Sequence, residues 1–145
     1  MGDRAKIKGK ANKLLEWIKG WDGFDGYAKL NAIVAEEGDA SLNIVVNDDV
    51  VEQYLDGTAL RDYTFMIKMI LPWSDGFDPV NVESENTAAS LLDWIDGQFP
   101  QNLPAWEGAD IREITLVNNA PSLDTVDTEE SIAEYSVIAK IRYVE

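Results

Sequence analysis

Carboxylates are the main side chains in this sequence that could do chemistry. The 145 residues include no histidine and no cysteine, so the commonest general base and all thiolate metal ligands are missing. Three acidic doublets remain, Asp48-Asp49, Glu36-Glu37 and Glu129-Glu130, and carboxylate oxygens are the ligands that divalent cations prefer. None of the doublets lies in a twelve-residue loop with alternating ligands, so solvated turns are the simpler interpretation.

Two Asp-Gly segments, WDGFDG and SDGFDP, resemble fragments of calcium loops only loosely. Asp-Gly pairs are more simply explained as turns. The sequence has no phosphate-binding loop, no dinucleotide fingerprint and no Gly-x-Ser-x-Gly motif. A carboxylate pair for hydrolysis would need a cleft, which a sequence does not display. We therefore expect no catalytic residue, no metal and no cofactor.

Residues 60–71 organise the rest of the chain. Apolar and aromatic side chains alternate there with mostly polar ones, a period of two that predicts a long strand with one face in the core. Pro72, which lacks an N–H group, should end it. Residues 132–144 repeat the alternation, so we expect a C-terminal strand in the same sheet, beside the first.

Two helices are predicted, over residues 4–19 and 82–98, from apolar residues spaced by three and four. Ser84 or Asn81 could cap the start of the second helix. Trp17, Trp21 and Phe24 cluster at the end of the first helix and are expected in the core. Further strands are predicted over residues 27–35, 42–46, 50–55 and 111–117.

Two of the connections between the predicted elements can be described from their residues, one as a tight turn and one as a long loop. Asp56-Gly57 predicts a tight hairpin turn into the organising strand. Residues 118–130 are acidic and turn-rich, and predict a long loop that is mobile until a partner orders it. The fold class is therefore α+β, a mostly antiparallel sheet with two main helices packed on it, in a single domain over residues 1–145.

Charge is distributed unevenly along the sequence. The formal net charge is −15, but residues 1–19 contain six basic and two acidic groups, a net +4. The remainder contains six basic and 25 acidic groups, a net −19. An acidic body repels nucleic acid, and the nearest acidic surface for the basic segment is another copy of the chain. No run of apolar residues is long enough to span a membrane, and no secretory signal is visible.

The order of elements resembles a family of small proteins from phages and prophages of Gram-positive bacteria, often called minor capsid proteins, which are similar to the tail terminators of long-tailed phages. The resemblance spans nearly the whole chain. It is carried by Leu14-Leu15-Glu16-Trp17, Asp56-Gly57-Thr58, Arg61 with the alternation after it, Asn81 to Glu85, Asp93-Trp94-Ile95 and the terminal strand.

The resemblance implies a structural virion assembly protein and not an enzyme. Such subunits close into a six-fold ring on the neck end of the tail tube, where they stop tube polymerisation and offer a surface for head–tail joining. The implied partners are other copies of the chain, the tail tube protein and a head-completion or connector protein. DNA only passes through the channel, and assembly takes place in the cytoplasm of the host bacterium.

Three alternatives stay open at this point. The first is a head–tail connector, or neck, protein. The second is a small-ligand or carbohydrate-binding module that uses Trp73 and Trp106 as exposed aromatic side chains. The third is a carboxylate-based hydrolase. A closed oligomer would indicate an assembly protein, and a monomer with an aromatic pocket would indicate a ligand-binding module. Two carboxylates that converge in a cleft would indicate a hydrolase.

The charge asymmetry suggests which residues meet a partner. We expect Lys6, Lys10 and Lys13 to form a basic face of the first helix that docks on an acidic surface of a neighbouring subunit or of the tail tube. The acidic segment near the C-terminus supplies a second set of candidate interface residues, Asp124, Asp127, Glu129 and Glu130.

Overall fold

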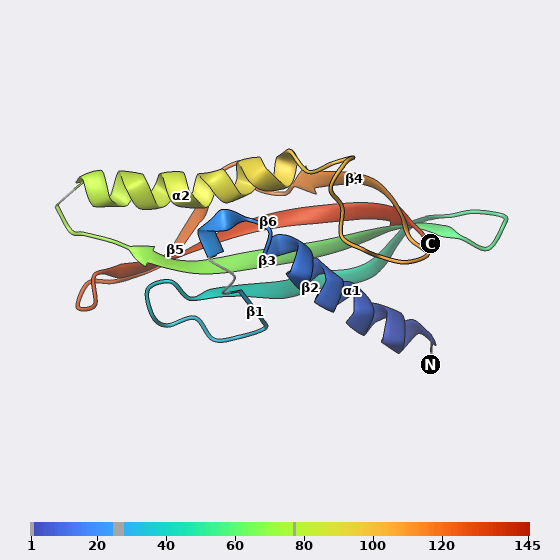
Figure 1. Cartoon of the computed structure of the whole chain (residues 1–145), viewed down its shortest axis with the longest axis horizontal. Helices are drawn as coiled ribbons and strands as arrows, with labels where there is room; N and C mark the ends of the chain where they lie inside the picture. Colours follow the sequence, from blue (N-terminus) through green and yellow to red (C-terminus); the bar gives the residue numbers. More distant parts are fainter. Residues whose placement is uncertain (1, 25–27, 77) are drawn as a thin grey trace.

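The computed structural model describes residues 2–24, 28–76 and 78–145, and it describes their side chains except at 2–8 and 46–48. The elements in chain order are α1 (Gly2–Ile18), the 3-10 helix η1 (Asp22–Phe24), β1 (Lys29–Leu30), β2 (Ala40–Gln53), β3 (Ala59–Pro72), α2 (Asp78–Asp96), β4 (Asp110–Leu116), β5 (Ser122–Asp127) and β6 (Ile132–Val144). Figure 1 shows two helices packed on a long sheet, so the predicted α+β class is confirmed.

The sheet is built around the pairing of β3 with β6. Its strand order is β1-β2-β3-β6-β4, with β5 paired to the remaining part of β6. The two long strands run antiparallel and in unbroken register from Leu60 opposite Val144 to Pro72 opposite Ile132. All other pairings are antiparallel except that of β1 with β2. The prediction that the C-terminal strand lies beside the organising strand is confirmed.

One face of the sheet carries the core. Tyr63, Phe65 and Ile67 on β3 are fully buried, as the alternation predicted. Trp17 of α1 lies edge-on to Phe65 at 6.4 Å between ring centroids and contacts Trp94 of α2 at 5.0 Å. Both helices therefore cover the same face, and the sheet's other face carries no helix of the described ranges (Figure 1).

Residues 118–130 are not the loop that we predicted, because Ser122–Asp127 forms β5 against β6. Residues 117 and 118, between β4 and β5, also bond to β6, so the pairing along this side of β6 continues from one strand to the other. Val117 donates its N–H to the carbonyl of Ile138 at 2.9 Å, and the Asn118 Oδ1 accepts the Ile138 N–H at 2.8 Å. The β5 strand shows no apolar alternation because all of its side chains are exposed, so it depends on the open edge of β6.

The N-terminal strands also differ from the prediction. The segments 42–46 and 50–53 belong to one strand, β2, which reaches from Ala40 to Gln53, and Tyr54 and Leu55 lie beyond its end. Three register shifts against β3 absorb the polar residues that suggested a turn. Of the strand expected over 27–35, only β1 forms in the described part, and Tyr27 lies outside it. Asn31 adopts φ 51°, which ends β1.

Neither proposed cap begins α2, since the helix begins earlier, at Asp78. Ser84 donates its hydroxyl to the carbonyl of Pro72 at 2.6 Å. The Asn81 side chain accepts the N–H of Ser74 at 2.9 Å and donates to its carbonyl at 2.8 Å. Both side chains therefore fix the connection between β3 and α2, and they do so from inside the helix.

The predicted turn at Asp56-Gly57 is confirmed and ends the β2–β3 hairpin. Gly57 adopts φ 93°, which only glycine tolerates easily. The Asp56 Oδ1 accepts the N–H and the hydroxyl of Thr58 at 3.0 and 2.6 Å. Figure 1 shows that this hairpin projects past the C-terminal end of β6. We call its outer part, residues 47–58, the arm.

Packing of α2 on the sheet should dominate the stability of the fold. Leu91 is fully buried between α2 and the sheet, whereas Val82 on the same helix is 56% exposed. Leu91→Ala should lower the free energy of unfolding by about 2–5 kcal/mol, because it leaves a cavity. Val82→Ala should change it by less than about 0.5 kcal/mol. Urea denaturation measures both, and equal losses would contradict this packing.

Candidate interaction surfaces

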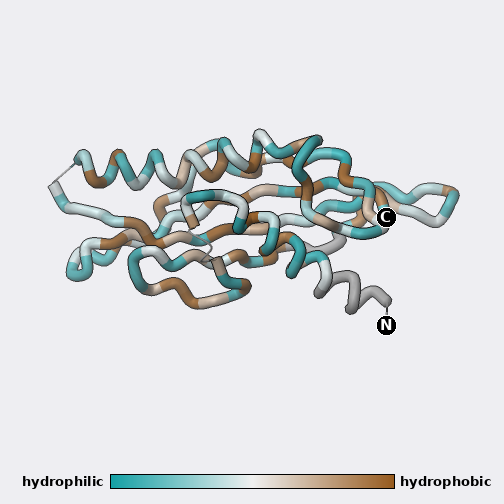
Figure 2. Tube along the Cα trace, viewed as in Figure 1, coloured by the Kyte–Doolittle hydropathy of each residue, from teal (hydrophilic) through white to brown (hydrophobic). Residues whose placement is uncertain are grey.

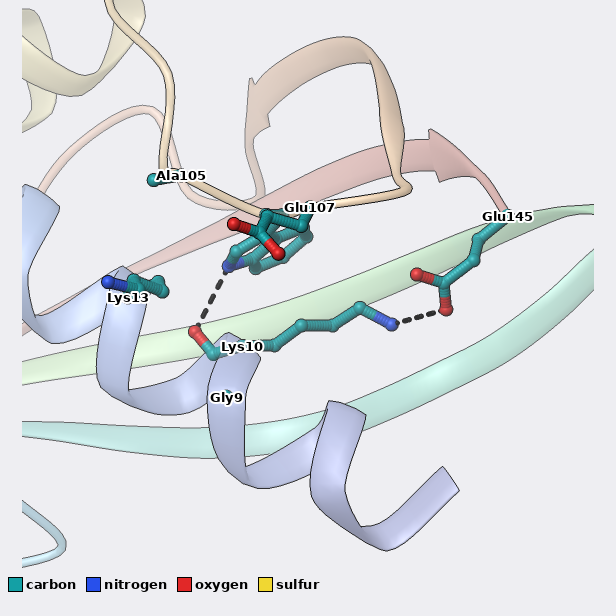
Figure 3. Close-up of a pocket in the computed structure, with 7 residues that line it drawn as sticks. Gly9, Lys10, Lys13, Ala105, Glu107 and Glu145 are labelled. Atoms are coloured by element: carbon teal, nitrogen blue, oxygen red, sulfur yellow. Dashed lines mark hydrogen bonds and ion pairs between the residues drawn. The ribbon is translucent and has the colours of Figure 1, made fainter. Parts of the chain in front are cut away.

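Lys10 anchors α1 to the end of β6. The side chain is only 4% exposed, and its Nζ donates to the Glu145 Oε1 at 2.8 Å and to the Tyr143 hydroxyl at 3.3 Å. The same ammonium group lies 4.6 Å from the centroid of the Tyr143 ring. Figure 3 shows the lysine stem running from α1 toward Glu145. A buried ammonium is tolerated because a carboxylate and an aromatic ring replace water around it.

The expectation that Lys10 belongs to an exposed basic face is therefore wrong. Helical spacing placed it near Lys13, but the end of β6 supplies a carboxylate and a ring that draw it inward. Lys13 remains on the surface, where its Nζ lies 3.5 Å from Glu16. The side chain of Lys6 lies outside the described part of the chain.

A hollow opens beside this anchor, between α1 and the segment that precedes β4. Its volume is about 450 Å³, and its lining residues are Gly9, Lys10, Lys13, Ala105, Trp106, Glu107 and Glu145. The indole of Trp106 is buried against Tyr63 and Tyr143, and its Nε1–H donates to the carbonyl of Lys10 at 3.0 Å. We call this hollow, with its apolar wall of Gly9, Ala105 and Trp106, the socket (Figure 3).

Trp106 is thus not the exposed aromatic residue that a ligand-binding module would need. It is 6% exposed and holds α1 in place. Trp73 is also partly buried, against the core. The sequence signal for this role was weak, because Trp106 lies in an irregular segment rich in proline and glycine.

The acidic candidates lie at the opposite end of β6 from Lys10. Asp127 accepts the N–H groups of Glu129 and Glu130, each at 3.1 Å, and so shapes the β5–β6 turn. Asp124 accepts the hydroxyl of Ser122 at 2.8 Å. All four acidic side chains are exposed. The subunit does not bring them near Lys10 or Lys13, because Asp127 pairs with Ile132 at the start of β6 and Lys10 with Glu145 after its end.

The arm exposes apolar side chains that contribute little to the fold of the subunit. Leu55 at its tip is 109% exposed, and Tyr54 beside it is 39% exposed. Val50 and Val51 are 42% and 45% exposed. Brown, hydrophobic colour is visible at the tip of the arm in Figure 2. Beyond Leu42, no strand of the described ranges covers the outer edge of β2. An exposed apolar group of this kind is typical of an interaction site.

The outer edge of β2 is nevertheless a poor template for a further strand. Register shifts at three places distort it, and the arm carries four acidic residues, Asp48, Asp49, Glu52 and Asp56, and no basic one. Bulges and charges are the devices that protect edge strands from pairing. Contacts of the arm are therefore expected to be made by its side chains.

A cluster of charges lies on the sheet face away from the helices. Arg142 binds Asp62 through two hydrogen bonds of 2.8 and 3.0 Å, and Lys140 lies 3.7 Å from the same carboxylate. The hydrogen bonds from Arg142 hold the pKa of Asp62 below its usual 3.8, with a smaller effect from the charge of Lys140. The cluster supports the register of β3 against β6 on a face where its side chains are buried or partly buried.

Other kinds of site find no support in the described residues. Within residues 2–24, 28–76 and 78–145, no three acidic side chains gather in a way that could hold a metal ion. No helix among those residues has the length and apolar character needed to cross a membrane. The sequence matches no family model and no curated protein.

The two lysines should respond differently to charge reversal. Lys10→Glu would bury a carboxylate beside Glu145 and remove the cation that pairs with it, so the free energy of unfolding should fall by about 3–5 kcal/mol. Lys13→Glu should cost at most about 1 kcal/mol, since only an exposed pair is lost. Thermal or urea unfolding tests this pair. Equal losses would contradict the anchoring role of Lys10.

Asp62 should make stability depend on pH. Because its pKa is lower in the folded than in the unfolded chain, its pairing stabilises the fold above pH 4 or so and is lost as the pH falls through the folded-state value. Asp62→Asn should therefore lower the free energy of unfolding at pH 7 by about 1–3 kcal/mol, with a difference that shrinks in acid. Asp110→Asn, which breaks the exposed pair with Arg112, is the control. A difference independent of pH would contradict this role.

Proposed function

We propose that this protein is a structural subunit that closes into a ring on the neck end of a phage tail tube, stops tube growth and joins the tail to the head. The proposal begins from the resemblance of the chain to the minor capsid proteins that are similar to tail terminators. The α+β architecture, with both helices on one face of a mostly antiparallel sheet, agrees with what that resemblance implies.

The observation that carries the proposal is the arm. Leu55, Tyr54, Val50 and Val51 are exposed together on a hairpin that projects beyond the body of the subunit. A monomer gains nothing from ordering apolar side chains in water, whereas an assembly subunit gains contact area. A surface that meets a different surface on the next copy makes a heterologous contact, and such contacts close into a ring when the rotation between copies allows it.

The charge of the chain agrees with a channel that DNA crosses. The acidic remainder of the sequence, with its net −19, would repel a phosphate backbone and let DNA pass without adhering. In this proposal the partners are other copies of the chain, the tail tube protein and a head-completion or connector protein. A neck protein that uses the same ring to bind the head is the close alternative.

The buried position of Trp106 argues against the ligand-binding alternative, because the aromatic surface that such a module would present is used to hold α1. For a hydrolase, the carboxylates of the described residues with a shifted pKa are Asp39, Asp56 and Asp62, and in each the pKa is lowered by hydrogen bonds, which does not suit a general acid.

Light scattering tests the ring directly. The purified protein, or the protein mixed with the tail tube protein of the same tail, should give a particle of six times the 16.2 kDa chain mass, and negative stain should show a ring with a central channel. Added to growing tubes, it should cap their ends and limit their length. A protein that stays monomeric with and without tubes, and leaves tube length unchanged, would contradict the function.

A further inference from the structure

The arm and the socket are two surfaces of one chain with complementary shapes and chemistry. The arm ends in a fully exposed leucine, next to an exposed tyrosine. The socket is a hollow of about 450 Å³ with an apolar wall of Gly9, Ala105 and Trp106. The arm does not fill the socket of its own subunit, because Leu55 is 109% exposed. An apolar side chain on one copy could therefore pack into the apolar hollow of the next copy, which is a heterologous contact when the copies form a ring.

Charge favours a second copy of this chain as the occupant. Residues 47–58 contain four acidic groups and no basic group, a net −4, whereas residues 1–19 have a net +4. The socket lies against α1, within that basic segment; its own lining contains two lysines and two glutamates, and Lys10 is paired with Glu145, so Lys13, 45% exposed at the rim, is the cation it offers to an acidic arm. Opposite charges on the two surfaces would orient the encounter, and the apolar contact would supply the affinity.

Gly9 lines the socket and has no side chain that could extend into it. It is an exposed residue inside α1, where glycine is unfavourable by about 1 kcal/mol relative to alanine. A Cβ atom at this position would meet no atom within 4 Å apart from its chain neighbours and the backbone of its own helix, so the fold of the subunit does not require glycine there. A larger side chain would instead extend into the space that the socket offers a partner.

We propose that Leu55 of one subunit inserts into the socket of the next, with the acidic arm lying along the basic α1. This inference rests on the proposed ring and names the contact that would build it. In a ring the contact is head to tail, since each subunit gives its arm to one neighbour and receives the arm of another. Tyr54 accompanies Leu55 and covers the edge of the socket.

Cross-linking provides the test, since the natural chain has no cysteine. Leu55→Cys and Gly9→Cys chains are mixed under mild oxidation, and disulfides should form between the two kinds of chain in preference to pairs of the same kind. The variant with both changes should form a ladder of covalent species larger than a dimer, ending at the closed ring. If the single variants show no preference for mixed pairs, the contact is absent, and if the double variant stops at the dimer, the contact is reciprocal; either result overturns the proposal.

Two surface variants check the contact without cysteine chemistry. Leu55→Asp should weaken association at least about tenfold, as loss of a central apolar contact does. Gly9→Phe should weaken it similarly by filling the socket, whereas Gly9→Ala should not. Val82→Asp, an exposed apolar position on α2, is the control and should leave association unchanged. Circular dichroism confirms that each variant is folded.

The outcomes separate this inference from the proposed function. A wild-type ring whose mass is unaffected by Leu55→Asp and Gly9→Phe would overturn the socket contact and leave the tail-terminator function standing. A wild-type chain that stays monomeric in the presence of tubes and fails to cap them would overturn both.

Discussion

The unbroken pairing of β3 with β6 is the constraint on which the rest of the structure depends. Thirteen consecutive residues of each strand face one another from Leu60–Val144 to Pro72–Ile132. Because side chains alternate along both strands, this register places Tyr63, Phe65 and Ile67 on the same face as Ile141, Ala139 and Val137. A shift by one residue would bring Asp62 and Arg142 into the core. The ion pair between these two residues stabilises the same register from the opposite face.

The two helices are held to this core by different means. The α2 helix buries Leu91, Leu92 and Ile95, so its position follows mainly from apolar packing. The α1 helix contributes Leu14 and Ile18 at its C-terminal end, but its middle is fixed by polar groups, the Lys10–Glu145 ion pair and the hydrogen bond from Trp106. A polar attachment of this kind specifies one position for the helix, and it leaves the socket open beside it.

The edges of the sheet separate the parts that stabilise the subunit from the parts available to partners. On one side, β4 and β5 together cover the length of β6, with Asn118 bridging the interruption. On the other side, β2 continues beyond its short pairing with β1 into the arm, where bulges and acidic residues disfavour strand addition. Exposed apolar side chains occur on both sides, but those of the arm project beyond the body of the subunit, and the proposed assembly contact uses them.

The sequence by itself determined the elements whose side chains alternate or repeat around a buried face. Residues 60–71, 132–144, 111–117 and both helices appeared close to the predicted bounds, since burial of one face imposes a period that is visible in the residues. The Asp56-Gly57 turn was equally predictable, because few residues tolerate a positive φ.

Only the tertiary structure decided the features that depend on a distant partner. The β5 strand is exposed on every residue and exists because β6 offers it a free edge, so the sequence showed only an acidic loop. Lys10 has the spacing of a surface lysine, yet Glu145 and Tyr143, far away in sequence, draw it into the protein. Trp106 and Gly9 line the same hollow only because α1 packs beside the segment before β4. Local periodicity records which face of an element is buried, and it contains no information about which other element supplies the contact.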